Sequence, residues 1–96
     1  MNLDEGHMLV AFVTQGCPYC RMTREKLNYI ATRNNLSSDK IRYIEPFDIG
    51  TDLFIQITYG NRPLVVLLDN GMPTTTYHYR NINEKEVTSW LQDFKQ

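Results

Sequence analysis

The chain has 96 residues, of which 42% are hydrophobic and 22% are charged, and its formal net charge is −1. A chain of this length is expected to form one domain, spanning 1–96, with residues 1–6 frayed. The balanced charge predicts neither a nucleic-acid partner nor binding to an anionic membrane surface. No apolar run reaches the roughly 18–20 residues that a membrane span needs. The opening MNLDEGHM is acidic and lacks the apolar core of a secretory signal, so the cytoplasm is the default expectation.

The first half of the chain predicts a strand, a helix and a second strand. His7–Val13 is an apolar run whose length suits a strand buried on both faces. From Pro18 to about Asn34 the apolar spacing becomes helical. The predicted inner face of this helix carries Met22, Leu27, Ile30 and Ala31. Lys40–Ile49 predicts the second strand, with Pro46 at its end or on an edge, and strands joined through a helix should be parallel.

The segment 50–71 predicts a short helix followed by a strand and a turn. Residues 50–60 suit one or two helical turns, with Thr51 or Asp52 as the N-cap and Gly60 at the end. Pro63–Leu68 is a further buried strand. The DNGM that follows is the strongest hairpin signal in the chain, because Asn-Gly tolerates the positive φ of a type I′ turn.

The last segment completes an α/β fold. Thr74–Arg80 is expected to return antiparallel to the preceding strand. A final helix is predicted by the spacing of Val87, Trp90, Leu91 and Phe94. Asn83, with Glu86 three residues on, is placed to cap that helix. The order β-α-β-α-β-β-α therefore predicts a mixed four-stranded sheet with helices on both faces.

Cys17 and Cys20 are the only cysteines, and they form the motif CPYC at the predicted turn from strand to helix. Structural zinc needs four ligands, and His7 and His78 lie in different strands far apart in sequence, so no metal site is expected. A structural disulfide that closes so short a loop adds little stability. A CxxC pair at the strand–helix junction of a βαβ unit is instead typical of a redox-active dithiol. The motif therefore favours thiol–disulfide exchange.

The start of the predicted helix gives a physical reason for Cys17 to be the nucleophile. Cys17 falls at the N-cap, where the helix macrodipole contributes at most ~1–2 kcal/mol to a thiolate. Lowering an ordinary thiol pKa by about two pH units needs about 2.7 kcal/mol. The remainder must come from the backbone N–H groups of Tyr19 and Cys20, or from a cation such as Arg21 or Arg24. Cys20 would lie one turn further on, where it could resolve a mixed disulfide.

The stretch FVTQGCPYC resembles the active-site strand and turn of glutaredoxins, which belong to the thioredoxin superfamily. The superfamily resemblance runs from about Met8 to Phe94 and implies a thioredoxin-like fold. It also implies a cis peptide bond before Pro63, opposite the cysteines, with the backbone of Arg62 pairing with the substrate. By the same resemblance, Tyr19 and Arg21 would contact the substrate or glutathione.

The resemblance implies a glutaredoxin-like dithiol oxidoreductase that reduces protein or glutathione mixed disulfides. It implies glutathione as co-substrate, no tightly bound cofactor and a monomer. Three features depart from that family: Thr14 replaces a basic residue, Arg62 replaces a valine, and YHYRNINEKE lacks the glycines of the glutathione site. A thioredoxin-type protein reduced by a flavoprotein thioredoxin reductase therefore remains an alternative. Two further alternatives are a non-catalytic thioredoxin-fold binding module and a protein that binds an iron–sulfur cluster bridging two chains.

Overall fold

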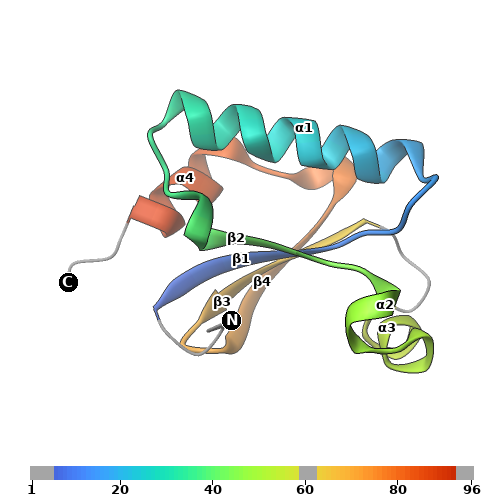
Figure 1. Ribbon diagram of the computed structural model, residues 1–96. Coiled ribbons are helices and arrows are strands. Elements are labelled where there is room, and N and C mark those ends of the chain that lie inside the picture. The colour runs from blue at the N-terminus through green and yellow to red at the C-terminus, as the bar shows by residue number, and fades with distance from the viewer. Residues whose placement is uncertain (1–5, 59–62, 93–96) are drawn as a thin grey trace.

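The computed structural model describes residues 6–58 and 63–92, and within these ranges four strands form one sheet with helices on both faces (Figure 1). The predicted α/β architecture is therefore confirmed. No helix in the described ranges is both long and apolar enough to cross a membrane. The elements in chain order are β1 (His7–Phe12), α1 (Pro18–Arg33), the 3₁₀ turn η1 (Ser38–Lys40), β2 (Ile41–Ile44), α2 (Pro46–Ile49), α3 (Thr51–Thr58), β3 (Leu64–Asp69), β4 (Met72–His78), the 3₁₀ turn η2 (Tyr79–Asn81) and α4 (Glu84–Gln92).

The strand order is β2-β1-β3-β4. As predicted, β1 and β2 are parallel and β3 and β4 are antiparallel, while β3 also runs antiparallel to β1. In the β1–β3 register, Phe12 pairs with Leu64. The end of β1 and the beginning of β3 therefore lie at the same end of the sheet, and the turn that carries the cysteines starts there.

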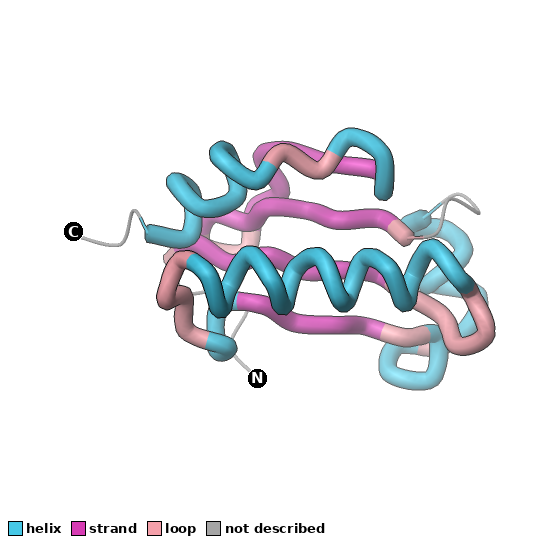
Figure 2. The backbone as a smooth tube through the Cα atoms, turned by 90° about the horizontal axis from the view of Figure 1, so that it is seen from above, coloured by secondary structure: helices cyan, strands magenta, loops and turns pink. Residues whose placement is uncertain are grey.

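Alternate residues of β1 face two separate apolar layers, as the two-residue period of a strand requires. Leu9 and Ala11 belong to the layer under α1 and α4, which Figure 2 shows side by side over the strands. Val10 and Phe12 belong to the layer under α3, where Phe54 is fully buried. Both faces of β1 are thus covered, which explains its unbroken apolar sequence.

The β3–β4 hairpin turns on the predicted Asn-Gly pair. Asn70 has φ 51° and Gly71 has φ 87°, and both angles lie in the positive range of a type I′ turn. Asp69 and Met72 close the turn as a strand pair. Gly6, which the sequence predicts to be frayed, exchanges two hydrogen bonds with Asn70. The start of β1 is therefore fastened to the hairpin.

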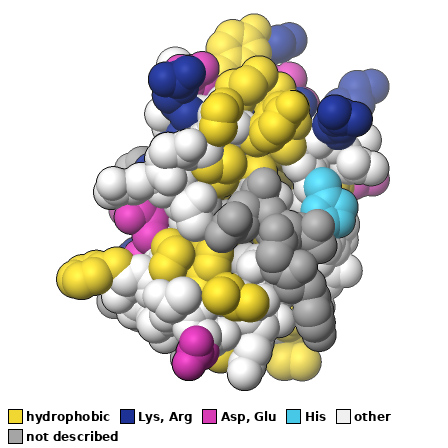
Figure 3. All heavy atoms as spheres, turned by 90° about the vertical axis from the view of Figure 1, so that its right-hand side faces the viewer, with side chains coloured by type: hydrophobic (Ala, Val, Ile, Leu, Met, Phe, Trp, Pro, Cys, Tyr) yellow, Lys and Arg dark blue, Asp and Glu magenta, His cyan; other side chains and the backbone are white. Residues whose placement is uncertain are grey.

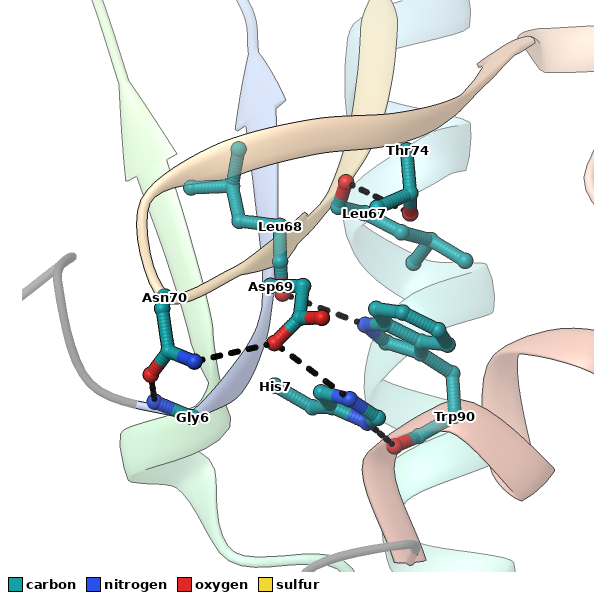
Figure 4. A network of polar contacts seen from close by, with 8 residues as sticks. All are labelled: Gly6, His7, Leu67, Leu68, Asp69, Asn70, Thr74 and Trp90. Atoms are coloured by element: carbon teal, nitrogen blue, oxygen red, sulfur yellow. Dashed lines mark hydrogen bonds and ion pairs between the residues drawn. The ribbon is translucent and has the colours of Figure 1, made fainter.

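A polar network closes the sheet at the end away from the cysteines (Figure 4). The His7 ring stacks on the Trp90 ring, with centroids 3.7 Å apart, and its Nδ1 lies 2.9 Å from the Trp90 carbonyl oxygen. Its Nε2 lies 3.7 Å from Asp69 Oδ1. Trp90 Nε1–H donates to the Leu68 carbonyl at 3.3 Å. These contacts attach α4 to β1 and β3; Phe94, predicted on the same helix face, lies outside the described residues.

The predicted second strand is wrong in its last part. β2 ends at Ile44, and Pro46 begins α2 instead of ending the strand. Glu45 is the N-cap of α2, and its backbone N–H donates to Asp48 Oδ2 at 2.8 Å. A proline lacks an N–H group, and this costs nothing at the first position of a helix, so the same residue that weakens a strand can start a helix. Gly60, predicted to end α3, lies outside the described residues.

The prediction that Met22 lies on the inner face of α1 is also wrong, because Met22 is 41% exposed. The buried stripe of α1 is formed by Cys20, Thr23, Leu27 and Ile30. Thr23 was not expected in a core, but its hydroxyl donates to the Tyr19 carbonyl at 2.8 Å. Thr23 lies four residues before Leu27 and seven before Ile30, so the helical period puts it on the buried face, where its hydroxyl is satisfied within the helix, whereas Met22 falls off that face.

We expect Asn83→Ala to lower the free energy of unfolding by about 1 kcal/mol, the usual cost of losing an N-cap. Asn83 Oδ1 accepts the backbone N–H of Glu86 at 3.1 Å, as the sequence predicts. Urea unfolding measures the change. The exposed Asn81 nearby supplies the control Asn81→Ala, which should differ little from wild type. Equal losses for the two variants would contradict a capping role for Asn83.

Candidate functional site

Cys17 is the N-cap residue of α1, the place that the sequence predicts for it. Its backbone is extended, with φ −101° and ψ 112°, and Pro18 follows as the first helical residue. The backbone N–H of Cys20 donates to Cys17 Sγ at 3.2 Å. The Cys17 sulfur therefore accepts from one of the N–H groups that a helix leaves free at its start, at the positive end of the helix dipole.

The surroundings push the pKa values of the two thiols in opposite directions. Partial burial raises the pKa of Cys17, but hydrogen bonds from the Cys20 thiol, from the N–H groups of Cys20 and Tyr19 and from Thr14 together lower that pKa below the ordinary thiol range. Burial raises the pKa of Cys20, and its hydrogen bond with Cys17 raises it further. Cys17 is thus suited to be the thiolate, while Cys20 keeps its proton.

Thr14 contacts Cys20, a role that the sequence did not reveal. The Thr14 backbone N–H donates to Cys20 Sγ at 3.5 Å, and the Thr14 hydroxyl lies 3.9 Å from the same sulfur. In the sequence Thr14 is notable only because it stands where glutaredoxins have a basic residue. Its place just after β1, within the short turn to α1, is what brings it to the sulfur.

Two tyrosine rings, of Tyr19 and Tyr79, lie beside the cysteine turn. Tyr19 is 49% exposed, and its ring centroid lies 5.3 Å from that of Tyr79. The Tyr79 hydroxyl donates to Met22 Sδ at 3.8 Å. Strand pairing stops at His78, which is opposite Leu64, so Tyr79 belongs to η2 and not to the predicted strand. That change of backbone direction carries the Tyr79 ring to the start of α1.

The two candidate cations do not have the same surroundings. Arg24 donates to Glu45 at 3.0 Å, and its guanidinium lies 4.4 Å from the centre of the Tyr43 ring. Its charge is therefore engaged by a carboxylate and an aromatic face. Arg21, in the first turn of α1, is exposed. Backbone and side-chain hydrogen bonds, and neither arginine, account for the lowered pKa of Cys17.

Pro63 is buried directly before β3. Since Leu64 pairs with Phe12, Pro63 lies at the same end of the sheet as the start of the cysteine turn. Arg62, and with it the peptide bond that joins Arg62 to Pro63, lies outside the described residues. The cis bond and the backbone contact of Arg62 with a substrate stay predictions.

Within residues 6–58 and 63–92, no three His, Cys, Asp or Glu side chains gather into a group that could hold a metal ion. His7 is engaged by Trp90 and Asp69, and His78 is exposed. The chemical groups at the cysteine turn are thus a thiol pair, hydrogen-bond donors and two phenol rings. Such a set is suited to exchange between sulfur atoms.

No protein-family model matches this sequence, and no curated protein sequence matches it. Among solved structures, the chain is similar to Fasciola hepatica thioredoxin, with a TM-score of 0.65 and 15% identity over 97% of this chain and 85% of that one. It is also similar to a mutant thioredoxin from Halobacterium salinarum, with a TM-score of 0.66 and 16% identity over 97% of this chain and 78% of that one. The predicted thioredoxin-like fold is therefore confirmed.

We expect Thr14→Val to raise the pKa of Cys17, because the Thr14 hydroxyl contributes to the lowering and valine matches its shape without a donor. The pH dependence of iodoacetamide alkylation, followed by mass spectrometry of each cysteine, measures this pKa. Wild-type Cys17 should react at a pH where Cys20 is inert, and Thr14→Val should need a higher pH. The exposed Thr32 on the far part of α1 supplies the control Thr32→Val, which should leave the profile unchanged. An unchanged profile in Thr14→Val would show that the hydroxyl has no part in it.

Proposed function

We propose that this protein is a thiol–disulfide oxidoreductase of the glutaredoxin type, which reduces protein or glutathione mixed disulfides. The observation that carries the proposal is the hydrogen bond from the Cys20 backbone N–H to Cys17 Sγ, 3.2 Å long, at the N-cap of a 16-residue helix. It gives a partly exposed sulfur a stabilised negative charge, with a second, buried sulfur one helical turn behind it. The thioredoxin-like fold of the chain supports the same function.

In the first step, the Cys17 thiolate attacks one sulfur of a substrate disulfide. A bond forms between Cys17 and that sulfur, the substrate S–S bond breaks, and the departing sulfur leaves with the electron pair as a thiolate. The departing thiolate takes a proton from solvent. Cys17 suits this step because its lowered pKa makes more thiolate available near neutral pH.

In the second step, Cys20 resolves the mixed disulfide. The Cys20 thiol first loses its proton to solvent. Its sulfur then attacks Cys17, which forms the Cys17–Cys20 bond and releases the substrate sulfur as a thiolate. Before the first step, the bound proton of Cys20 supports the Cys17 thiolate by a hydrogen bond. Once Cys17 is in a disulfide that charge is gone, and one source of the raised Cys20 pKa disappears with it.

Return of the dithiol needs two electrons, and we propose glutathione as their source. One glutathione thiolate opens the Cys17–Cys20 disulfide, and a second releases glutathione disulfide and the reduced protein. The CPYC motif supports this assignment by resemblance to glutaredoxins. In this proposal Tyr19, Arg21, Arg62 and Pro63 contact the substrate or glutathione. The protein acts as a cytoplasmic monomer without a tightly bound cofactor, and with neither nucleic acid nor membrane as a partner.

A thioredoxin-type protein, reduced by a flavoprotein reductase, is the second candidate. Two observations favour it. The solved structures described above are thioredoxins, and one further match, at a TM-score of 0.62 and 11% identity over 96% of this chain and 77% of that one, is thioredoxin O2 of Arabidopsis thaliana in its oxidised state. In addition, Tyr79 belongs to the stretch that lacks the glycines of the glutaredoxin glutathione site, and its ring lies against Tyr19 near the cysteine turn.

We expect Cys17→Ser to abolish disulfide reduction, since serine at neutral pH supplies no comparable nucleophile. Cys20→Ser should instead accumulate a covalent adduct with the substrate, because the resolving sulfur is missing. Turnover measured with a disulfide peptide and mass spectrometry of the trapped adduct test both expectations. Normal turnover by Cys17→Ser would refute the mechanism and would leave a non-catalytic binding module as the better description.

We expect the wild-type protein to turn over a disulfide peptide when it is supplied with glutathione, glutathione reductase and NADPH. The same assay with thioredoxin reductase and NADPH serves as the comparison. Both arms follow the loss of NADPH absorbance, and Cys17→Ser supplies the background rate. Activity only in the thioredoxin reductase arm would overturn the glutaredoxin assignment and favour the second candidate.

A further inference from the structure

The surface formed by α2 and α3 is apolar to an extent that folding alone does not require. Phe47 is 95% exposed, so its ring makes almost no contact with the rest of the described protein. Leu53 and Ile55 are each about half exposed, and Ile57 is 37% exposed. Single exposed apolar side chains are common, but here Leu53 and Ile57 lie one turn apart on α3 and Phe47 stands out from the adjacent α2, which is typical of an interaction surface. We call this the α2–α3 surface.

The α2–α3 surface is also acidic. The sequence from residue 43 to residue 61 contains Glu45, Asp48 and Asp52 and contains neither lysine nor arginine. Arg24, which comes from α1, compensates Glu45 at 3.0 Å. Asp48 and Asp52 are exposed, and neither α2 nor α3 contains a positively charged residue. A partner that binds here must supply positive charge as well as apolar side chains.

A hollow beside the surface is suited to an apolar anchor. It has a volume of about 290 Å³, and Ile57 forms one of its walls. Apart from Thr76, the other walls are apolar side chains of the sheet and its hairpin, among them Phe12, Ile44, Leu64 and Val66. Interfaces obtain most of their binding energy where an apolar or aromatic side chain fills a pocket of this kind.

The α2–α3 surface and Cys17 lie at the same end of the molecule. β1 and β2 are parallel, β1 ends at the cysteine turn, and β2 ends at α2 (Figure 1). Figure 3 looks onto this end and shows one apolar group over the start of α1 and another below it. The whole molecule measures 36 × 25 × 20 Å, so about eight extended residues would cross this end.

We propose that the α2–α3 surface docks the substrate protein, through a segment rich in basic and apolar residues that lies near the disulfide offered to Cys17. This inference rests on the proposed oxidoreductase function and names its substrate class. Glutathione does not fit the surface, because it is a tripeptide with a net negative charge at neutral pH. A second copy of this chain does not fit either, because a twofold contact would bring Asp48 and Asp52 of both copies together.

The test uses single turnover by the prereduced protein, so that no external electron donor enters. Two synthetic 15-residue peptides each carry one cysteine as a mixed disulfide with 2-mercaptoethanol. One peptide has leucine and lysine residues on the amino-terminal side of the cysteine, and the other has glutamate for each lysine. The third substrate is the plain disulfide of 2-mercaptoethanol. Rates come from chromatography of the released thiols at low and at physiological salt.

We expect the basic peptide to react about tenfold faster than the acidic peptide at low salt, with a smaller ratio at higher salt. Asp52→Lys should remove most of this preference, and Phe47→Ser should slow both peptides several-fold. Neither change should alter the rate with the plain disulfide. Phe47 is almost fully exposed, so Phe47→Ser leaves the core intact. Asp52→Asn removes the charge more conservatively and should give an intermediate preference.

The controls repeat the same chemical changes at the opposite end of the sheet. Asp39→Lys makes the same charge change in η1, and Met72→Ser removes a side chain that is 68% exposed in the hairpin. Neither control should change the preference between the peptides beyond what its effect on net charge predicts. Equal rates for the two peptides, or equal effects of Asp52→Lys and Asp39→Lys, would overturn the docking proposal. Failure of the proposed function would give a different result, because the wild-type protein would then reduce none of the three substrates.

Discussion

The hydrogen bond from the Cys20 N–H to Cys17 Sγ is the interaction on which the candidate site depends. It exists because Cys17 caps α1 and because Cys20, only 1% exposed, anchors the first turn of that helix in the core. The same burial raises the pKa of Cys20, while the donated N–H helps to lower that of Cys17. One packing arrangement therefore positions the helix and divides the roles of the two thiols.

The local part of this arrangement could be predicted from the sequence. The change of period after Val13, the proline of CPYC and the Asn-Gly turn each act within a few residues, so they indicated the N-cap, the sheet and the hairpin correctly. Pro46 shows the limit of such signals. A proline is compatible with both the end of a strand and the start of a helix, and only the contacts of Glu45 and Asp48 select the second.

The parts that the sequence did not reveal are contacts between distant segments. Tyr79 reaches Tyr19 because strand pairing stops at His78 and the chain turns into η2. No residue near position 79 predicts this end of the strand. Met22 faces outward because it lies five residues before Leu27, off the helical stripe on which Thr23 is buried with its hydroxyl satisfied. The position of Tyr79 depends on tertiary packing, whereas that of Met22 follows the helical period, which a reading of apolar residues alone misplaced because one member of the buried stripe is a threonine.

The two ends of the sheet are built differently, and this difference bears on who exchanges electrons with the protein. At one end, the His7–Trp90 stack and the Asp69 contact close the core with satisfied polar groups. At the other end, the half-exposed Tyr19 lies near Cys17, whose pKa is lowered, and α2 and α3 add the exposed carboxylates of Asp48 and Asp52. The exposed carboxylates of α2 and α3 attract a basic polypeptide, whereas the exposed Arg21 in the first turn of α1 attracts an anion such as glutathione. Under the function proposed above, a protein substrate and glutathione therefore need not share a contact surface, although both react with the same sulfur.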